Sequence, residues 1–460
     1  MLLSLPRILV TSVALFSVVV EADIFLPYNA NQPDLEPRSQ VIFNSSSPLN
    51  ASDVRGTPNI ASRMEVTSNG TLYCGRPEDS FESGYVHLTN SAGEEDKHLF
   101  LVVDRLFKAR HDPKNAPVVM TLGGGPGASG MLFPFSGAGP CSITVNATGG
   151  GEAIPSLYSW TEHANLLAID HPVGVGFSYG DQASLRNSSL TAAWDTDDFL
   201  QAFWKNTFMI NSGSYGGHLW MHESICKDGP ESHMFFNSTA CAHLVDQLPE
   251  CLDSIQYAYQ QQTSPSRVDA MNKCSYPLGG IWDDFPQRDP YDYRTKCPLE
   301  GCDSLAFGPI IDVLDSNIVK DMIGVSRERN YKVLAVDEIS TLLYTMETCT
   351  MACDYLASTK VYTSSLAFDS STEYSYNGME DGVCPWRSSL AWMRLLETKY
   401  QTAFREAPEV EYPGVGTIRQ ARGGNYTFVK VREAGHMVIR SRPELLQHLM
   451  FKWITNEPFF

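Results

Sequence analysis

Apolar segments that alternate with helix-like segments constrain the fold of this 460-residue chain more than any other feature. Strand-like segments occur at 98–103, 116–122, 164–169, 208–210, 373–376 and 426–431, and helix-like patterns at 191–204 and 443–454. Buried strands that alternate with helices are typical of a mostly parallel sheet flanked by helices. The sequence therefore predicts an α/β fold.

The stretch 226–358 departs from this alternation. It is rich in cysteine and contains helix-like pieces at 252–262 and 310–323. We interpret it as a disulfide-stapled helical insertion, with residues 61–225 and 359–460 forming the two parts of the core. A cap over the active-site end is favoured because ligands of open α/β sheets bind at the carboxyl ends of the strands. Structural filler is the alternative.

The N-terminus has the pattern of a targeting segment. Arg7 precedes an apolar run at 8–20, and Ala22 provides a small residue at a cleavage position. This pattern predicts a signal peptide at 1–22, and the run is too short to span a bilayer comfortably. Residues 23–60, rich in Asn, Pro and Ser, are interpreted as a leader or propeptide. We expect no membrane association after cleavage, and a location outside the cell or in the vacuolar lumen.

Glycosylation sequons and cysteines agree with passage through the secretory pathway. N-x-Ser/Thr sequons begin at Asn44, Asn50, Asn69, Asn146, Asn187, Asn237 and Asn425. The chain has 11 cysteines, which an oxidising compartment favours as disulfides. The pairs Cys297/Cys302 and Cys349/Cys353 lack the spacing of a zinc knuckle, and no paired histidines follow them. We therefore expect neither a metal nor another cofactor.

Charge argues against one class of partner. Asp and Glu outnumber Lys and Arg by 53 to 34, which gives a formal net charge of −19. Nucleic-acid binding requires clustered basic side chains, so we expect no nucleic-acid partner. The acidic balance suits a protein that works at mildly acidic pH, although ordinary solubility explains it equally well.

A tight turn of small residues follows the strand-like segment at 208–210. Residues 211–217 read Asn-Ser-Gly-Ser-Tyr-Gly-Gly, with Ser214 at the centre. A sharp strand-to-helix turn of this kind lifts a nucleophilic serine clear of the sheet. The usual pattern is G-x-S-x-G, and Ser212 here replaces its first glycine. The segment predicts a nucleophile elbow, with an ordinary small-residue loop as the alternative.

Three further segments fit the same chemistry. Residues 123–127 form a glycine-rich turn at a strand end, which can aim backbone N–H groups at a developing oxyanion. The turn lacks the Lys-Ser/Thr ending of a phosphate-binding loop, and a plain turn remains possible. Asp381 and His436 each follow a late strand-like segment. The order Ser214, Asp381, His436 is that of the catalytic triad in α/β-hydrolases.

Several segments together resemble the serine carboxypeptidases, especially the fungal members of that family. They lie at 83–88, 112–115, 124–127, 139–141, 159–160, 164–167, 170–179, 214–218, 381–384 and 435–438. The resemblance implies an α/β-hydrolase fold and a triad in which Ser214 attacks, His436 transfers the proton and Asp381 orients the imidazole. It also implies an oxyanion hole from the backbone N–H groups of Gly124 and Tyr215. Cys384 matches a free thiol near the substrate, which leaves ten cysteines for pairing.

The chain departs from the family at the substrate clamp. The family binds the terminal carboxylate with one Asn and two Glu side chains, and the matching positions here are Gly123, Gly137 and Gly213. Beyond His218 the family continues through a helix and another central strand, whereas this chain passes almost directly to Cys226. Loss of a central strand would leave backbone groups of its neighbours unpaired. Missed coding sequence and real loss both explain the shortening.

Three functions remain open from the sequence. The first is a serine carboxypeptidase that removes C-terminal residues from peptides through an acyl-enzyme. The second is an acyltransferase or esterase that acts on a small acyl substrate, which the retained triad and the missing clamp favour. The third is an inactive homologue. The sequence does not reveal the oligomeric state.

Overall fold

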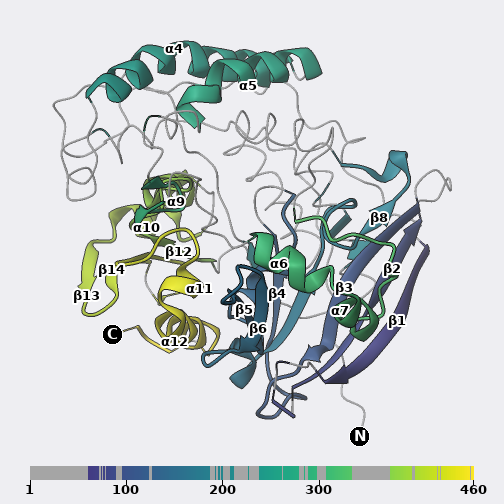
Figure 1. Cartoon of the computed structure of the whole chain (residues 1–460). Coiled ribbons are helices and arrows are strands. Elements are labelled where there is room, and N and C mark those ends of the chain that lie inside the picture. The colour runs from purple at the N-terminus through teal and green to yellow at the C-terminus, as the bar shows by residue number, and fades with distance from the viewer. Residues whose placement is uncertain are drawn as a thin grey trace, which may run out of the picture. The chain divides into compact units, whose positions relative to one another are not determined.

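The computed structural model describes residues 61–71, 74–89 (without 75 and 78), 96–123, 127–186, 208–211, 238–261, 263–278, 288–297, 307–333, 373–395, 399–421, 423–424, 426–455 and 457–459, together with residues 192, 195, 196, 198, 199, 226 and 284. The expected signal peptide at 1–22 and the leader at 23–60 lie outside these residues. Figure 1 shows the described elements.

The larger sheet has seven strands, in the order β1-β2-β3-β7-β4-β9, with β8 paired to β3. Their bounds are β1 Ala61–Thr71, β2 Ser80–Thr89, β3 Asp96–Phe107, β4 Val118–Leu122, β7 Asn165–Ile169, β8 Tyr179–Gly180 and β9 Phe208–Asn211. Pairing is antiparallel from β1 through β3 to β7, and parallel from β7 through β4 to β9. The five residues of β7 are all buried, as expected for a strand covered on both faces.

A second sheet of four strands has the order β12-β15-β14-β13. Its strands are β12 Glu373–Gly378, β13 Glu409–Tyr412, β14 Gly416–Gln420 and β15 Tyr426–Val431. Only β12 and β15 run parallel. Strand β9 is the last strand at one edge of the larger sheet, and β12 is an edge strand of the smaller sheet. No other described strand pairs with both.

Helices and hairpins connect these sheets. They are α1 Leu132–Phe135, β5 Cys141–Val145, β6 Gly151–Pro155, η1 Trp160–Glu162, η2 Gln182–Ser184, α4 Ser238–Gln261, α5 Ser264–Leu278, β10 Arg288–Asp289, β11 Asp292–Lys296, α6 Phe307–Leu314, α7 Asn317–Met322, α9 Trp386–Leu395, α10 Gln401–Glu406, α11 Val438–Ser441 and α12 Pro443–Ile454. Strand β15 and helix α12 have the bounds expected from the sequence. The single helix expected at 310–323 is instead two, because Ser316 caps the start of α7 through the N–H of Val319.

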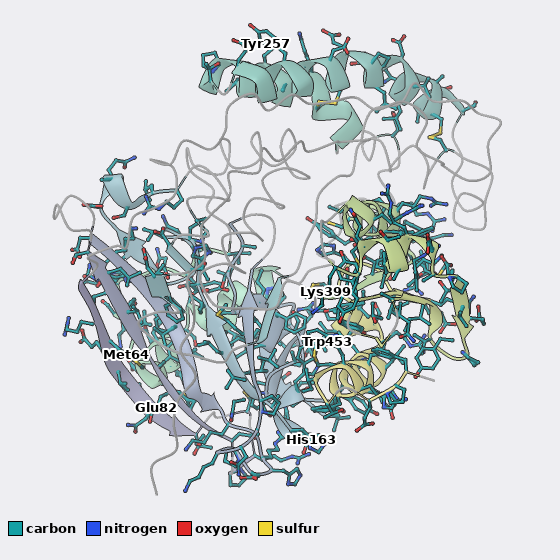
Figure 2. All side chains as sticks on the ribbon, turned by 180° about the vertical axis from the view of Figure 1, so that it is seen from behind. Met64, Glu82, His163, Tyr257, Lys399 and Trp453 are labelled. Carbon is teal, nitrogen blue, oxygen red and sulfur yellow. A yellow bond between two sulfur atoms is a disulfide. The ribbon has the colours of Figure 1, made fainter. Side chains whose placement is uncertain are left out.

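One cluster of buried apolar side chains draws on both sheets. It includes Phe100, Val119 and Leu166 from the larger sheet and Ile418 and Val429 from the smaller one. Side-chain packing therefore joins the two sheets, although no described backbone ladder does. Outside this core, Met64 on β1 and Tyr257 on α4 are exposed, by 42% and 54% (Figure 2). Within the described part of the chain, no helix has the length and apolar character needed to cross a bilayer.

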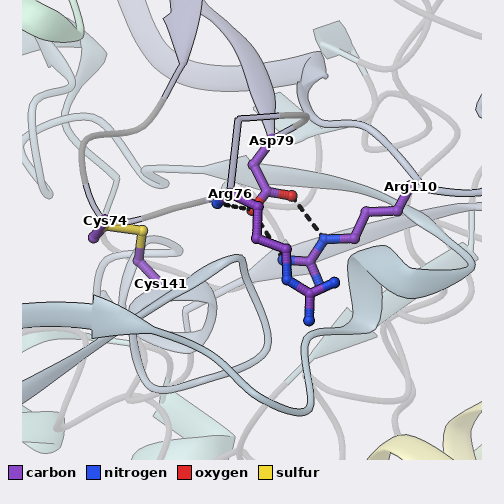
Figure 3. Close-up of a disulfide and its surroundings, with 5 residues drawn as sticks. All are labelled: Cys74, Arg76, Asp79, Arg110 and Cys141. Atoms are coloured by element: carbon purple, nitrogen blue, oxygen red, sulfur yellow. Dashed lines mark hydrogen bonds and ion pairs between the residues drawn. A yellow bond between two sulfur atoms is a disulfide. The ribbon is translucent and has the colours of Figure 1, made fainter.

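One disulfide and a buried ion pair hold the segment before β2. Cys74 is bonded to Cys141 at the start of β5, across 67 positions. Beside this disulfide, the Arg110 guanidinium donates from Nε and Nη2 to the two carboxylate oxygens of Asp79, at 2.8 and 2.9 Å (Figure 3). The Arg76 backbone N–H donates to the same carboxylate at 2.7 Å. A buried guanidinium is thus neutralised with bidentate geometry.

The insertion contributes further disulfides. Cys226 pairs with Cys241, and Cys251 pairs with Cys274, which ties α4 to α5. Cys297 is also disulfide-bonded. These bonds agree with the disulfide-rich helical insertion expected from the sequence.

Candidate functional site

Asp381 and His436 meet because they follow adjacent parallel strands. In the register of β12 and β15, Gly378 is paired with Val431 at the carboxyl ends of both strands. The turns that leave these ends therefore lie together. The Nδ1 atom of His436 is 2.8 Å from Oδ2 of Asp381, a hydrogen-bond distance.

The turn after β12 holds the Asp381 carboxylate in a fixed orientation. Its Oδ1 atom accepts hydrogen bonds from the backbone N–H groups of Val383 and Cys384, each at 2.9 Å. The side chain is 2% exposed, whereas that of His436 is 18% exposed. An ionised carboxylate only accepts hydrogen bonds, so Nδ1 of His436 must donate to it. In neutral His436, Nε2 is then the atom that accepts a proton.

The charge of Asp381 also sets the proton affinity of the histidine. Burial opposes the charged imidazolium, but the adjacent Asp381 carboxylate outweighs burial and raises the pKa of His436 well above its ordinary value. Cys384 is a free, buried cysteine next to this pair. Burial raises the pKa of its thiol, although His436 partly offsets that rise. The thiol is therefore neutral at and below neutral pH.

A hairpin from the insertion contacts both turns. The backbone N–H of His436 donates to the carbonyl of Tyr291 at 2.7 Å, and that of Gly382 donates to the carbonyl of Pro290 at 3.0 Å. The Tyr291 ring lies edge-on to the His436 imidazole, with 5.4 Å between centroids. Gly435 permits this approach, because a Cβ there would lie 2.2 Å from the Tyr291 carbonyl oxygen. No local pattern in the sequence marks this hairpin, because its contacts with the two turns join segments that lie far apart along the chain.

The expected nucleophile and oxyanion donors follow two adjacent strand ends. Ser214, Tyr215, Gly213 and Gly124 lie outside the described residues. Strands β4 and β9, which precede Gly124 and Ser214, are parallel neighbours in which Leu122 is paired with Asn211. The segments that contain Gly124 and Ser214 therefore begin at neighbouring positions on the same edge of the sheet.

The other expected positions are divided between described and undescribed residues. Gly123 and Gly137 are described, as are the sequon residues Asn69 and Asn146. Asn69 lies in the exposed edge strand β1, and the side-chain oxygen of Asn146 accepts from the hydroxyl of Thr148 at 2.8 Å. The sequon residues outside the described part of the chain are Asn44, Asn50, Asn187, Asn237 and Asn425.

One group of described side chains has donor atoms close enough to hold a metal ion. It consists of Asp381, Cys384 and His436, whose ligand atoms lie within 4.8 Å of one another. A cation bound to these atoms would block proton transfer by the His436 imidazole. The hydrogen-bonded pair Asp381–His436, here called the dyad, otherwise leaves that imidazole available for proton transfer. The residues of the dyad thus suit acid–base chemistry and metal binding as alternatives.

Comparison with known proteins places the chain in a family. The family model described as serine carboxypeptidase matches residues 74–221 and 220–456. Carboxypeptidase Y of Candida albicans is 26% identical over 426 residues, which cover 82% of this chain and 73% of that protein. Carboxypeptidase Y homolog A of Sclerotinia sclerotiorum is 28% identical, with coverage of 79% and 71%.

A solved structure shares the fold. The prohormone-processing carboxypeptidase Kex1 of Saccharomyces cerevisiae superposes with a TM-score of 0.54 at 16% sequence identity, covering 87% of this chain and 92% of its own. This likeness confirms the α/β-hydrolase class, here with sheets that combine parallel and antiparallel pairing. The family model covers most of the chain, including both residues of the dyad. The chain therefore belongs to the serine carboxypeptidase family.

Proposed function

We propose that this protein is a serine-type hydrolase that cleaves C-terminal residues from peptides through a Ser214–His436–Asp381 triad. Ser214 Oγ attacks the carbonyl carbon while His436 Nε2 takes its proton. The backbone N–H groups of Gly124 and Tyr215 stabilise the oxyanion. His436 then protonates the leaving amine, and water releases the acyl group from Ser214 by the same steps.

The observation that carries this proposal is the hydrogen bond between Asp381 and His436. Its geometry puts the imidazole proton on Nδ1 and reserves Nε2 as a base, as the mechanism requires. The shared register of β4 and β9 supports the roles of Gly124 and Ser214, because it starts their turns from neighbouring positions. The family supplies the substrate class.

A fluorophosphonate probe tests the nucleophile directly. We expect the wild-type protein to be labelled covalently at Ser214, and Ser214→Ala to abolish labelling while the fold is retained. Peptide mapping by mass spectrometry identifies the labelled residue, and Ser254→Ala, at a buried serine in helix α4, serves as a control that keeps the label. A folded wild-type protein that resists the probe would contradict the proposal and favour an inactive homologue.

An acyltransferase or esterase activity is the second candidate, and Gly123 favours it. In the observed backbone a Cβ at Gly123 would lie 1.7 Å from the carbonyl oxygen of Ala128 and 2.8 Å from the carbonyl carbon of Ser129. Backbone atoms cannot move aside as a flexible side chain can, so this turn excludes the clamp asparagine. Gly137 has a φ of +124°, which disfavours a glutamate. A site without these groups has weaker means to select a free carboxylate.

We expect Gly123→Asn to destabilise the protein instead of restoring carboxylate selectivity. The overpacked turn should lower the free energy of unfolding by about 1–3 kcal/mol. Chemical denaturation measures this loss, and rates on a blocked dipeptide and its ester measure selectivity. Gly70→Asn is the matched control, because a Cβ at Gly70 would meet only the Phe81 ring, at an ordinary contact distance of 3.6 Å. A stable Gly123→Asn protein that prefers the free acid would refute the steric argument.

We also propose a location in the secretory pathway, outside the cell or in the vacuolar lumen. The seven sequons, the disulfides and the N-terminal targeting pattern support this location. The substrate would then be a peptide or a small acyl compound present in such a compartment.

A further inference from the structure

The hairpin formed by β10 and β11, at Arg288–Lys296, makes hydrogen bonds to the turn that contains Asp381 and to His436. Besides the two backbone bonds described above, the backbone N–H of Tyr293 donates to the carbonyl of Glu380 at 3.2 Å. The buried Tyr293 hydroxyl donates to the carbonyl of Met379 at 2.9 Å. Four bonds thus reach the residues from Met379 to Gly382 and His436, from a segment that precedes Met379 by 86 positions along the chain.

Glu380 links the three parts through its side chain. Its Oε2 atom accepts from the backbone N–H of Ala434 at 2.8 Å and lies 3.9 Å from Nη1 of Arg294 in the hairpin. Arg294 is itself held by Asp292, at 2.8 and 2.5 Å. Ala434 is fully buried, so its N–H requires an acceptor inside the protein. A single carboxylate therefore joins the aspartate turn, the histidine turn and the insertion.

We propose that Glu380 and the hairpin that carries Tyr293 and Arg294 are positioning groups that set the Asp381–His436 geometry. They act through the two turns and touch no reacting atom. The proposal deepens the function proposed above and rests on it for its kinetic consequence. Its structural consequence, the strength of the Nδ1–H bond to Asp381, stands independently of Ser214.

Glu380→Ala provides the main test. Removing the carboxylate leaves the Ala434 N–H without its acceptor and removes the ion pair with Arg294, so the histidine turn should shift relative to Asp381. We expect kcat to fall by about tenfold or more with KM little changed, since small misplacements of catalytic groups are costly. The far-downfield proton NMR resonance of the His436 Nδ1–H should broaden or move upfield. Glu380→Gln retains an acceptor oxygen and should restore most of both signals.

Two further variants complete the experiment. Glu411→Ala removes an exposed carboxylate that pairs with Arg432 away from the dyad, and should leave the resonance and kcat unchanged. Tyr293→Phe removes only the hydroxyl bond to Met379, and provides a milder perturbation if Glu380→Ala fails to fold. If Tyr293→Phe and a folded Glu380→Ala both match Glu411→Ala in the resonance and in kcat, the positioning role is wrong.

The two proposals fail in distinguishable ways. A wild-type protein that resists the fluorophosphonate would remove the proposed function, yet its Nδ1–H resonance would still report on the hairpin. Normal labelling of the wild type, with an unperturbed resonance in Glu380→Ala and Tyr293→Phe, would remove the positioning role alone.

Discussion

Asp381→Asn should lower kcat by about ten-thousand-fold while the protein stays folded. The carboxylate accepts a hydrogen bond from Nδ1 of His436 and so keeps Nε2 free of hydrogen. An asparagine can present its NH2 group to Nδ1, which moves the imidazole hydrogen to Nε2. Nε2 of His436, which should receive the proton of the serine hydroxyl, then already carries a hydrogen. Steady-state rates on a blocked dipeptide and the rate of fluorophosphonate labelling both measure this loss.

Asp321→Asn is the matched control for that experiment. It makes the same chemical change at an exposed carboxylate, which pairs with Arg327 at 2.5 Å. We expect this variant to keep the wild-type kcat, and circular dichroism should show that both variants are folded. An Asp381→Asn protein that turns over within tenfold of the control would exclude Asp381 from the triad.

The stability of the wild type should fall as the pH rises from about 4 to about 7, because of a second aspartate. Asp170 is fully buried, and burial raises its pKa from 3.8 to about 7 despite hydrogen bonds from Ser129, Phe177 and Met131. The folded chain therefore keeps a proton that the unfolded chain releases between these two values. Stability from this group is complete below the lower pKa and declines as the pH approaches the upper one. The difference corresponds to about 4 kcal/mol.

The surroundings of Asp170 explain why it stays protonated. Ser129 donates its hydroxyl hydrogen to Oδ1, the Phe177 N–H donates to Oδ2 at 2.9 Å, and the Tyr331 hydroxyl donates to Ser129 Oγ at 2.6 Å. These partners are all neutral, so none provides a counter-charge for a buried carboxylate. The cluster joins the segment after the glycine-rich turn to the end of β7.

Asp170→Asn should remove this pH dependence. The amide oxygen can accept from Phe177 and the amide nitrogen can donate to Ser129, without a charge to bury. Urea denaturation across pH 4–7 should give a flatter stability curve for the variant than for the wild type, with Asp321→Asn retaining the wild-type slope. Parallel curves for Asp170→Asn and the wild type would show that Asp170 is ionised throughout this range.

The sequence predicts the segments with strong local patterns and misses those that depend on distant partners. Strand β15 and helix α12 have uniform apolar content or a clear amphipathic pattern, and their expected bounds are correct. Strand β1 was not expected, because this edge strand is polar and mostly exposed along the described part of its length. In the rest of the antiparallel half, β3 overlaps the strand predicted at 98–103, whereas no strand is predicted at β2, although most of its residues are buried.

In the candidate site, too, some contacts can be predicted from the sequence and others cannot. The order of Asp381 and His436 after late strands was enough to expect their contact, since adjacent parallel strands end at one edge of a sheet. The contributions of Tyr293 and Glu380 could not be expected. Each depends on hydrogen bonds between segments that approach only after the chain has folded, and neither segment carries a local signature of that approach.

The separation of β9 from β12 has a consequence for cooperativity. The strand before Ser214 and the strands before Asp381 and His436 belong to different backbone ladders, which no pairing between described strands joins and which share one buried apolar cluster. Amide exchange in one ladder can then proceed by local opening without breaking the other. Because catalysis needs both, activity should be lost at the opening free energy of the weaker ladder. Inactivation would thus precede global unfolding.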